Sequence, residues 1–225
     1  MIEQLRAKIR ELEAKGRFNG RAYPEGIELF PKTLVGQGFF PGGDGLWRED
    51  EPSALRSPGR GEFPDRGIMF LGNDFGTLAS FTRLKLHENP PTWRFIRKRL
   101  MASGISGQLG FFTNAYLGLR ADRDALAEGM QMLEYDQMCD ELLAYQVNQQ
   151  RPKLVVVLGD RPCRLVQSTY SIQQLPKGKV CSISLDSDHL RILAVSHPFS
   201  DLRKSPTEIQ KEGTILRETW NFANR

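Results

Sequence analysis

Hydrophobic residues recur along the chain in two patterns, one typical of helices and the other typical of buried strands. Near the amino terminus, apolar residues stand three or four positions apart among charged ones, which predicts an amphipathic helix over residues 2–15. Short continuous apolar runs instead predict strands that are covered on both faces. Such runs occupy residues 68–71, 110–115, 153–159 and 191–196, and a weaker run predicts an edge strand at 180–185.

Helical patterns separate these strands and decide the fold class. They predict helices at residues 78–86, 92–103, 135–149, 161–169 and 206–224. Strands that alternate with helices are typical of an α/β protein with a parallel sheet. We therefore predict a three-layer α/β/α sandwich with a mainly parallel, four- to five-stranded central sheet joined by right-handed crossovers.

A segment rich in glycine and proline precedes the first predicted strand and interrupts the alternation. Regular structure should be sparse in it, although Phe30 and Phe40 are too apolar for a free linker. We predict a long, mostly irregular wrap on the domain surface. The chain then divides into an amino-terminal helix and wrap, residues 1–65, and an α/β/α domain, residues 66–225.

Composition and charge indicate the class of protein and its compartment more clearly than they indicate its function. With 225 residues, 40% of them hydrophobic and 26% charged, the chain is ordinary for a globular domain with appendages. The net charge of +4 permits a polyanionic partner without requiring one. The amino terminus lacks the apolar core of a signal peptide, which predicts a cytoplasmic protein without a membrane partner. The cysteines Cys139, Cys163 and Cys181 are widely spaced, so neither a disulfide framework nor a metal site is predicted.

Polar residues follow three of the predicted strands at the point where each apolar run stops. Asn73 and Asp74 follow the first strand, Asn114 ends the second, and His197 follows the last. Since the carboxyl ends of parallel strands share one edge of the sheet, an acid, an amide and an imidazole would meet at one cleft. Each residue also has an ordinary interpretation, with Asp74 as a helix cap, Asn114 in a turn and His197 in a loop. Their shared position favours a site.

Four motifs, in this order along the chain, resemble those of the uracil-DNA glycosylase superfamily. The first is Gly72-Asn-Asp-Phe-Gly76 after a strand, and the second is Phe111-Phe-Thr-Asn-Ala-Tyr-Leu-Gly-Leu-Arg120, in which an apolar run ends in Asn-Ala. The third is the strand Pro152-Lys-Leu-Val-Val-Val-Leu-Gly159, and the fourth is His197-Pro-Phe-Ser-Asp-Leu-Arg203. Each motif is short, and the ordered set is considerably more specific than any one of them.

The resemblance implies a monofunctional DNA glycosylase that flips a base out of DNA and hydrolyses its glycosidic bond. Asp74 would stabilise the cationic sugar and position or activate the attacking water. His197 would donate a hydrogen bond to the base carbonyl where negative charge develops. Asn114, with Asn73, would bind the edge of the base.

The resemblance also implies contacts beyond the reacting atoms. An aromatic ring, either Phe75 or Phe81, would stack on the flipped base. The loop after the last strand would enter the DNA, where a leucine fills the gap left by the base and polar side chains hold phosphates. The residues implied in this loop are Ser200, Leu202, Arg203 and Lys204.

The sequence departs from the family pattern at three positions. Phe75 stands where the family usually has proline, and Gly76 stands where the best-known branch has a tyrosine that excludes the thymine methyl group. Phe199 replaces a serine or another small residue. We expect the choice of base to depart from that of the best-known members mainly at the Phe75–Gly76 pair. Three scattered cysteines cannot supply the four-cysteine iron–sulfur cluster of some branches, so no cofactor is predicted.

Two other functions fit the same residues. The fold could serve as a binding module that recognises nucleic acid or a protein partner without catalysis. It could also belong to an unrelated α/β enzyme that acts on a nucleotide or another small phosphate ester, although the sequence has no P-loop and no GxGxxG motif. The partner expected under the leading interpretation is single- or double-stranded DNA, bound by a monomer.

Overall fold

Strands and helices alternate along the chain in this computed structural model, which describes residues 2–46, 66–83, 91–122, 132–175, 177–185, 188–196 and 204–224. The strands are β1 Ile27–Glu28, β2 Ile68–Gly72, β3 Gly110–Asn114, β4 Leu119–Arg120, β5 Leu154–Leu158, β6 Val180–Leu185 and β7 Asp188–Val195. The α-helices are α1 Ile2–Ala14, α2 Leu78–Thr82, α3 Pro91–Ser103, α4 Met132–Gln150, α5 Asp160–Thr169 and α6 Pro206–Ala223. The described residues also form two 3₁₀ turns, η1 Lys32–Leu34 and η3 Gly107–Leu109.

The central sheet has five strands in the order β3-β2-β5-β7-β6. β2 pairs in parallel with β3 and with β5, and β5 pairs in parallel with β7. β6 is antiparallel to β7 and forms one edge. All five residues of β5 are buried, as expected for a strand covered on both faces. The predicted mainly parallel α/β sheet is therefore confirmed.

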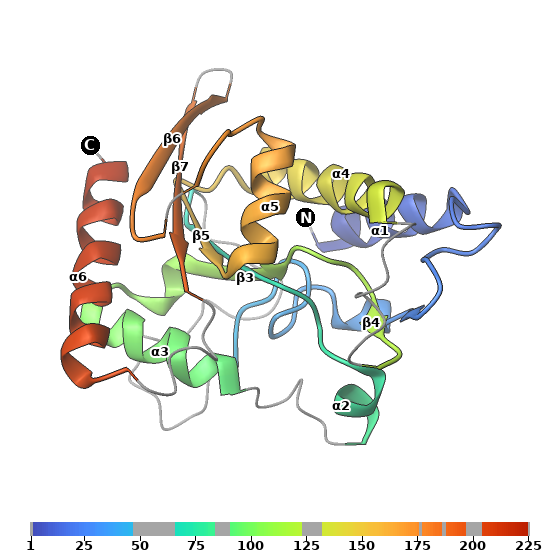
Figure 1. Ribbon diagram of the computed structural model, residues 1–225, viewed down its shortest axis with the longest axis horizontal. Coiled ribbons are helices and arrows are strands. Elements are labelled where there is room, and N and C mark those ends of the chain that lie inside the picture. The colour runs from blue at the N-terminus through green and yellow to red at the C-terminus, as the bar shows by residue number, and fades with distance from the viewer. Residues whose placement is uncertain are drawn as a thin grey trace.

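Helices cover both faces of this sheet and complete the three predicted layers (Figure 1). On one face, α3 and α6 pack against each other and bury Trp93, Ile96, Leu100 and Leu216 against alternate residues of the strands. On the other face, α4 packs against both α5 and α1. Because successive side chains of a strand point to opposite faces, each buried strand supplies both cores.

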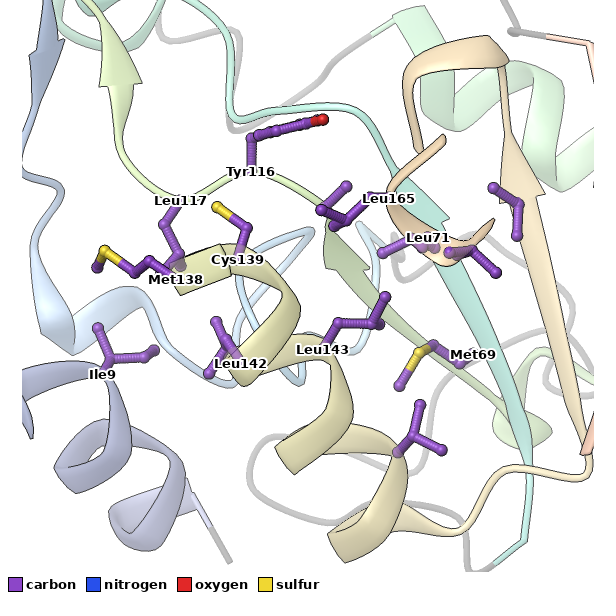
Figure 2. Close-up of a cluster of buried hydrophobic side chains, with 14 of the residues drawn as sticks. Ile9, Met69, Leu71, Tyr116, Leu117, Met138, Cys139, Leu142, Leu143 and Leu165 are labelled. Atoms are coloured by element: carbon purple, nitrogen blue, oxygen red, sulfur yellow. The ribbon is translucent and has the colours of Figure 1, made fainter. Parts of the chain in front are cut away.

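The core beneath α4 draws on segments that are far apart in the sequence. Figure 2 shows Ile9 from α1, Met69 and Leu71 from β2, and a row of α4 side chains that includes Leu142 and Leu143. These residues are at most 2% exposed. The amino-terminal helix is thus part of the main core rather than a separate appendage.

The described part of the wrap, residues 15–46, is mostly irregular, as predicted, but most of its large apolar side chains belong to the core rather than to the surface. Phe30, Val35 and Phe40 are each less than 5% exposed. The wrap also contacts the outer edge of β3, where Gly43 and Phe112 exchange two backbone hydrogen bonds of 3.0 and 2.8 Å. The predicted domain boundary at residue 65 lies outside the described residues.

No helix in the described part of the chain is long and apolar enough to cross a membrane.

Candidate active site

The predicted acid and amide, Asp74 and Asn114, lie at the same edge because β2 and β3 are parallel and in register. Gly72 at the end of β2 lies opposite Asn114 at the end of β3. The segments beyond the strands continue side by side, since the backbone N–H groups of Ala115 and Tyr116 donate to the carbonyls of Gly72 and Asn73, at 2.9 and 3.0 Å. Asp74 and Asn114 therefore lie on the same edge of the sheet, as the sequence predicted.

The predicted imidazole follows β7, which is separated from β2 by β5. The described chain ends there at Ser196, and His197 lies outside the described residues. Three of the predicted DNA-contacting residues, Ser200, Leu202 and Arg203, lie outside them as well. Of the three predicted side chains, Asp74 and Asn114 therefore lie among the described residues.

The Asp74 carboxylate is held by donors on both of its oxygens. Oδ2 accepts a hydrogen bond from Nδ2 of Asn73 at 2.7 Å, and Oδ1 accepts one from the backbone N–H of Gly76 at 2.8 Å. Arg120 completes the set, with Nε 3.2 Å from Oδ2 and Nη2 3.4 Å from Oδ1. The carboxylate is 8% exposed. These contacts hold a charged acid in a fixed orientation at the end of β2.

A capping role does not explain Asp74. The N-cap of α2 is Thr77, whose hydroxyl oxygen accepts from the backbone N–H of Ser80 at 3.1 Å. Gly76, which precedes this cap, has φ +83°, a conformation that a glycine adopts without strain. The segment from Asp74 to Thr77 continues beside the segment that follows β3, with Thr77 bridged in parallel to Arg120, and Asp74 stays at the sheet edge.

Asn114 is buried and has little freedom to turn. Its Nδ2 donates to the backbone carbonyl of Phe39 in the wrap, at 3.3 Å. Its Oδ1 occupies the space beside Gly72, where an added Cβ would lie only 2.1 Å away. A glycine at the end of β2 is thus what allows the amide to lie across the neighbouring strand. The second N–H of the amide and the remaining lone pair of its oxygen are the groups that could bind a base edge.

The side chain of Asn73 is held by a hydrogen bond to its neighbour Asp74. Its Nδ2 donates to Asp74, as described above. Its Oδ1 is buried and has no hydrogen-bond partner among the described residues. Buried acceptors usually have a partner, so this oxygen is a polar atom of the site that a ligand could satisfy.

The two predicted stacking residues lie in an aromatic cluster built with the wrap. Phe40 stacks on Phe75, with ring centroids 4.8 Å apart and planes 7° apart. Phe30 packs on Phe75 at 5.2 Å, and the ring of Phe81 meets Phe40 edge-on at 6.1 Å. The rings of Phe30 and Phe40 thus cover much of Phe75, and the wrap supplies the aromatic wall beside Asp74.

Lys204, the remaining predicted phosphate contact, lies before α6. Its ammonium group forms an ion pair with Glu212, which also pairs with the buried Arg99 at 2.6 Å. Ser205 and Glu208 form a capping box that begins α6 next to it. The Lys204 side chain is 18% exposed, and its charge is paired with Glu212 of the helix that follows it.

Burial raises the pKa of three groups beside the site. Burial, together with the charge of Asp136, raises the pKa of Tyr116 to about 12. Burial raises the pKa of the Cys139 thiol to about 12 as well. Burial also raises the pKa of Asp136, against the opposing effects of Arg161 and of a hydrogen bond from Tyr116. Tyr116 and Cys139 therefore lack the anionic form that a nucleophile needs at neutral pH.

Sequence reasoning gave no role to Arg120, although the residue ends the second motif. Its only sequence signal is a positive charge at the end of the apolar run from Ala115 to Leu119. The ion pair with Asp74 depends on two loops meeting in space, which neither loop encodes alone.

In the parts of the chain that the structure describes, no three His, Cys, Asp or Glu side chains gather in an arrangement that could hold a metal ion. The chain matches no protein-family model, and it matches no curated protein either.

Proposed function

We propose that the protein is a monofunctional DNA glycosylase that flips uracil, or a related deaminated or damaged base, out of DNA and hydrolyses its glycosidic bond. One observation carries the proposal: a carboxylate held by protein donors stands beside a fixed carboxamide at the carboxyl edge of a parallel sheet. Ligands of open α/β sheets bind at this edge. An acid and an amide are also the groups that base excision requires.

The reaction breaks the bond between C1′ of the sugar and the ring nitrogen of the base. The base leaves with the bonding electrons, and the sugar becomes oxocarbenium-like in the transition state. In the proposed reaction, the negative charge of Asp74 stabilises this cation, and its carboxylate orients a water molecule for attack on C1′. The water oxygen bonds to C1′, and its two protons end on the sugar hydroxyl and on the departing base.

We assign recognition of the base to the side-chain amides of Asn114 and Asn73. One amide can donate to a base carbonyl and accept from a ring N–H, which is the pattern that uracil presents. Asn114 supplies this pair, and the buried Oδ1 of Asn73 adds an acceptor. The donor for the developing negative charge on the base is assigned to His197 through the family resemblance alone.

The proposal is tested with oligonucleotides that carry uracil, hypoxanthine, xanthine or mismatched thymine, with cleavage of the resulting abasic sites as the readout. We expect release of at least one base by the full-length protein without added cofactor. Asp74→Asn should lower turnover by roughly 10²–10⁴-fold, the usual contribution of a positioned acid or base. Asp160→Asn is the matched control, because Asp160 lies just past β5 at the same edge but is exposed and paired with Lys177.

The alternative is a non-catalytic module that binds nucleic acid or a protein partner on the same fold. The observation that favours it is that both oxygens of Asp74 already contact protein donors. Salt-dependent DNA binding, with no base released from any of the four lesions, would select this alternative. Under either function we expect a cytoplasmic monomer.

A further inference from the structure

Arg120 approaches Asp74 with two nitrogens rather than one. Nη2 donates a hydrogen bond to Oδ1 at 3.4 Å, and Nε lies 3.2 Å from Oδ2 as an ion-pair contact rather than a hydrogen bond. The guanidinium thus contacts both carboxylate oxygens, one through a charge-assisted hydrogen bond and the other through electrostatic attraction. The pair is largely enclosed, with side-chain exposures of 22% for Arg120 and 8% for Asp74.

The backbone that carries Arg120 is itself fixed on two sides. Its N–H donates to the carbonyl of Gly76 at 3.0 Å, which ties β4 to the turn that contains Asp74. On its other side β4 is antiparallel to β1, with Arg120 opposite Ile27. The preceding Gly118 has φ +83°, and a Cβ there would lie 2.4 Å from the Ile27 side chain. The guanidinium therefore extends from a short strand that cannot easily shift.

We infer that Arg120 is a positioning residue for Asp74, an inference that rests on the proposed function. A carboxylate offers about four acceptor sites, and the contacts from Asn73, Gly76 and Arg120 use both oxygens. Asn73 and Gly76 each hold one oxygen, and Arg120 supplies the positive charge that lies against both oxygens from β4. Without it, Asp74 would keep its other two hydrogen bonds but would lose the contact that holds the carboxylate against β4.

The test measures base release under single-turnover and steady-state conditions with the base that the wild-type protein removes. We expect Arg120→Met to lower kcat by about 100-fold, the cost of a misplacement of about 1 Å, with little change in KM. Arg120→Lys should recover part of this loss, because lysine keeps the charge but lacks the two-nitrogen fork. Arg191→Met is the matched control, since Arg191 lies at the opposite end of the parallel strands, over the ring of Phe222.

A double-mutant cycle separates positioning from a general structural role. In an Asp74→Asn background, Arg120→Met should change the rate by less than about threefold, because its effect passes through the carboxylate. If Arg120 had a general structural role, Arg120→Met would lower the rate of base release by the same factor in both backgrounds. That result would overturn the inference. If the Met variant does not fold, as judged by circular dichroism, Arg120→Gln is measured in the same cycle.

The outcomes distinguish this inference from the proposed function. If the wild-type protein releases no base from any lesion, both are overturned. If the wild-type protein is active and Arg120→Met retains at least half of its rate, the inference about Arg120 is overturned and the proposed function stands.

Discussion

Replacing Gly72 with alanine should disturb the site through one added methyl group. The new Cβ would lie 2.1 Å from Oδ1 and 3.3 Å from Cγ of Asn114. Non-bonded carbons settle about 3.5–4.0 Å apart, so the buried amide has to move by more than about 1 Å. Such a move also breaks its hydrogen bond to the Phe39 carbonyl.

The magnitude of this effect follows from overpacking and from misplacement. Inserting a methyl group into a packed interior costs about 1–3 kcal/mol, which lowers Tm by roughly 2–12 °C in a chain of this size. A displacement of about 1 Å in a residue that positions the substrate costs up to about 100-fold in rate. Gly72→Ala should therefore show both losses together.

Melting followed by circular dichroism and base release from the preferred lesion measure the two effects. Gly110→Ala is the matched control, because it adds a methyl group at the other end of β3, where the nearest atom is a carbon of the Phe70 ring at 3.1 Å. It should cost some stability and leave the rate unchanged. In Gly72→Ala/Asn114→Ala the clash is removed, so Tm should be no lower than that of Asn114→Ala. Wild-type Tm and rate in Gly72→Ala would refute the contact between Gly72 and the amide.

Two further predictions concern the core beside the site. Tyr135→Phe removes the hydroxyl that donates to the buried carbonyl of Leu117, and should cost about 1–3 kcal/mol in urea unfolding, whereas Tyr145→Phe on the same helix should cost less. Asp136 has a raised pKa because it is desolvated, so its stabilising contribution is present below its unfolded pKa and is lost as pH rises through the folded value. Asp136→Asn should therefore be more stable than the wild-type protein at neutral pH, and the difference should shrink toward pH ~3.5. Equal stability of the two proteins across this range would contradict the assignment.

Local patterns were sufficient to predict most of the elements. The strand at 180–185 and the helix beginning at residue 206 are found with those limits, because an apolar run and a Ser-Pro start are encoded within a few residues. The polar ends of β2 and β3 were also predicted to meet, since parallel strands in one sheet place their carboxyl ends together.

Contacts between distant segments were not predictable in the same way. The pairing of β1 with β4 joins residues near 27 to residues near 120, and nothing in either dipeptide indicates its partner. The same limit concealed the role of the wrap, whose Phe39 carbonyl fixes the Asn114 amide and whose Phe40 ring covers Phe75. Burial of glycine- and proline-rich sequence depends on the surface it meets, and the composition of the segment does not reveal that surface.

The backbone pairing of Gly43 with Phe112 has a consequence for any shortened form of the protein. β3 is the outermost parallel strand, and Gly43 occupies part of the edge where another chain could otherwise add a strand. A chain that begins at residue 66 would present these polar groups, beside exposed phenylalanine rings, as a template for self-association. Precipitation of such a fragment would report the uncovered sheet edge together with the core exposed by the loss of α1, and it would say nothing about whether the residues at the carboxyl edge can act on DNA.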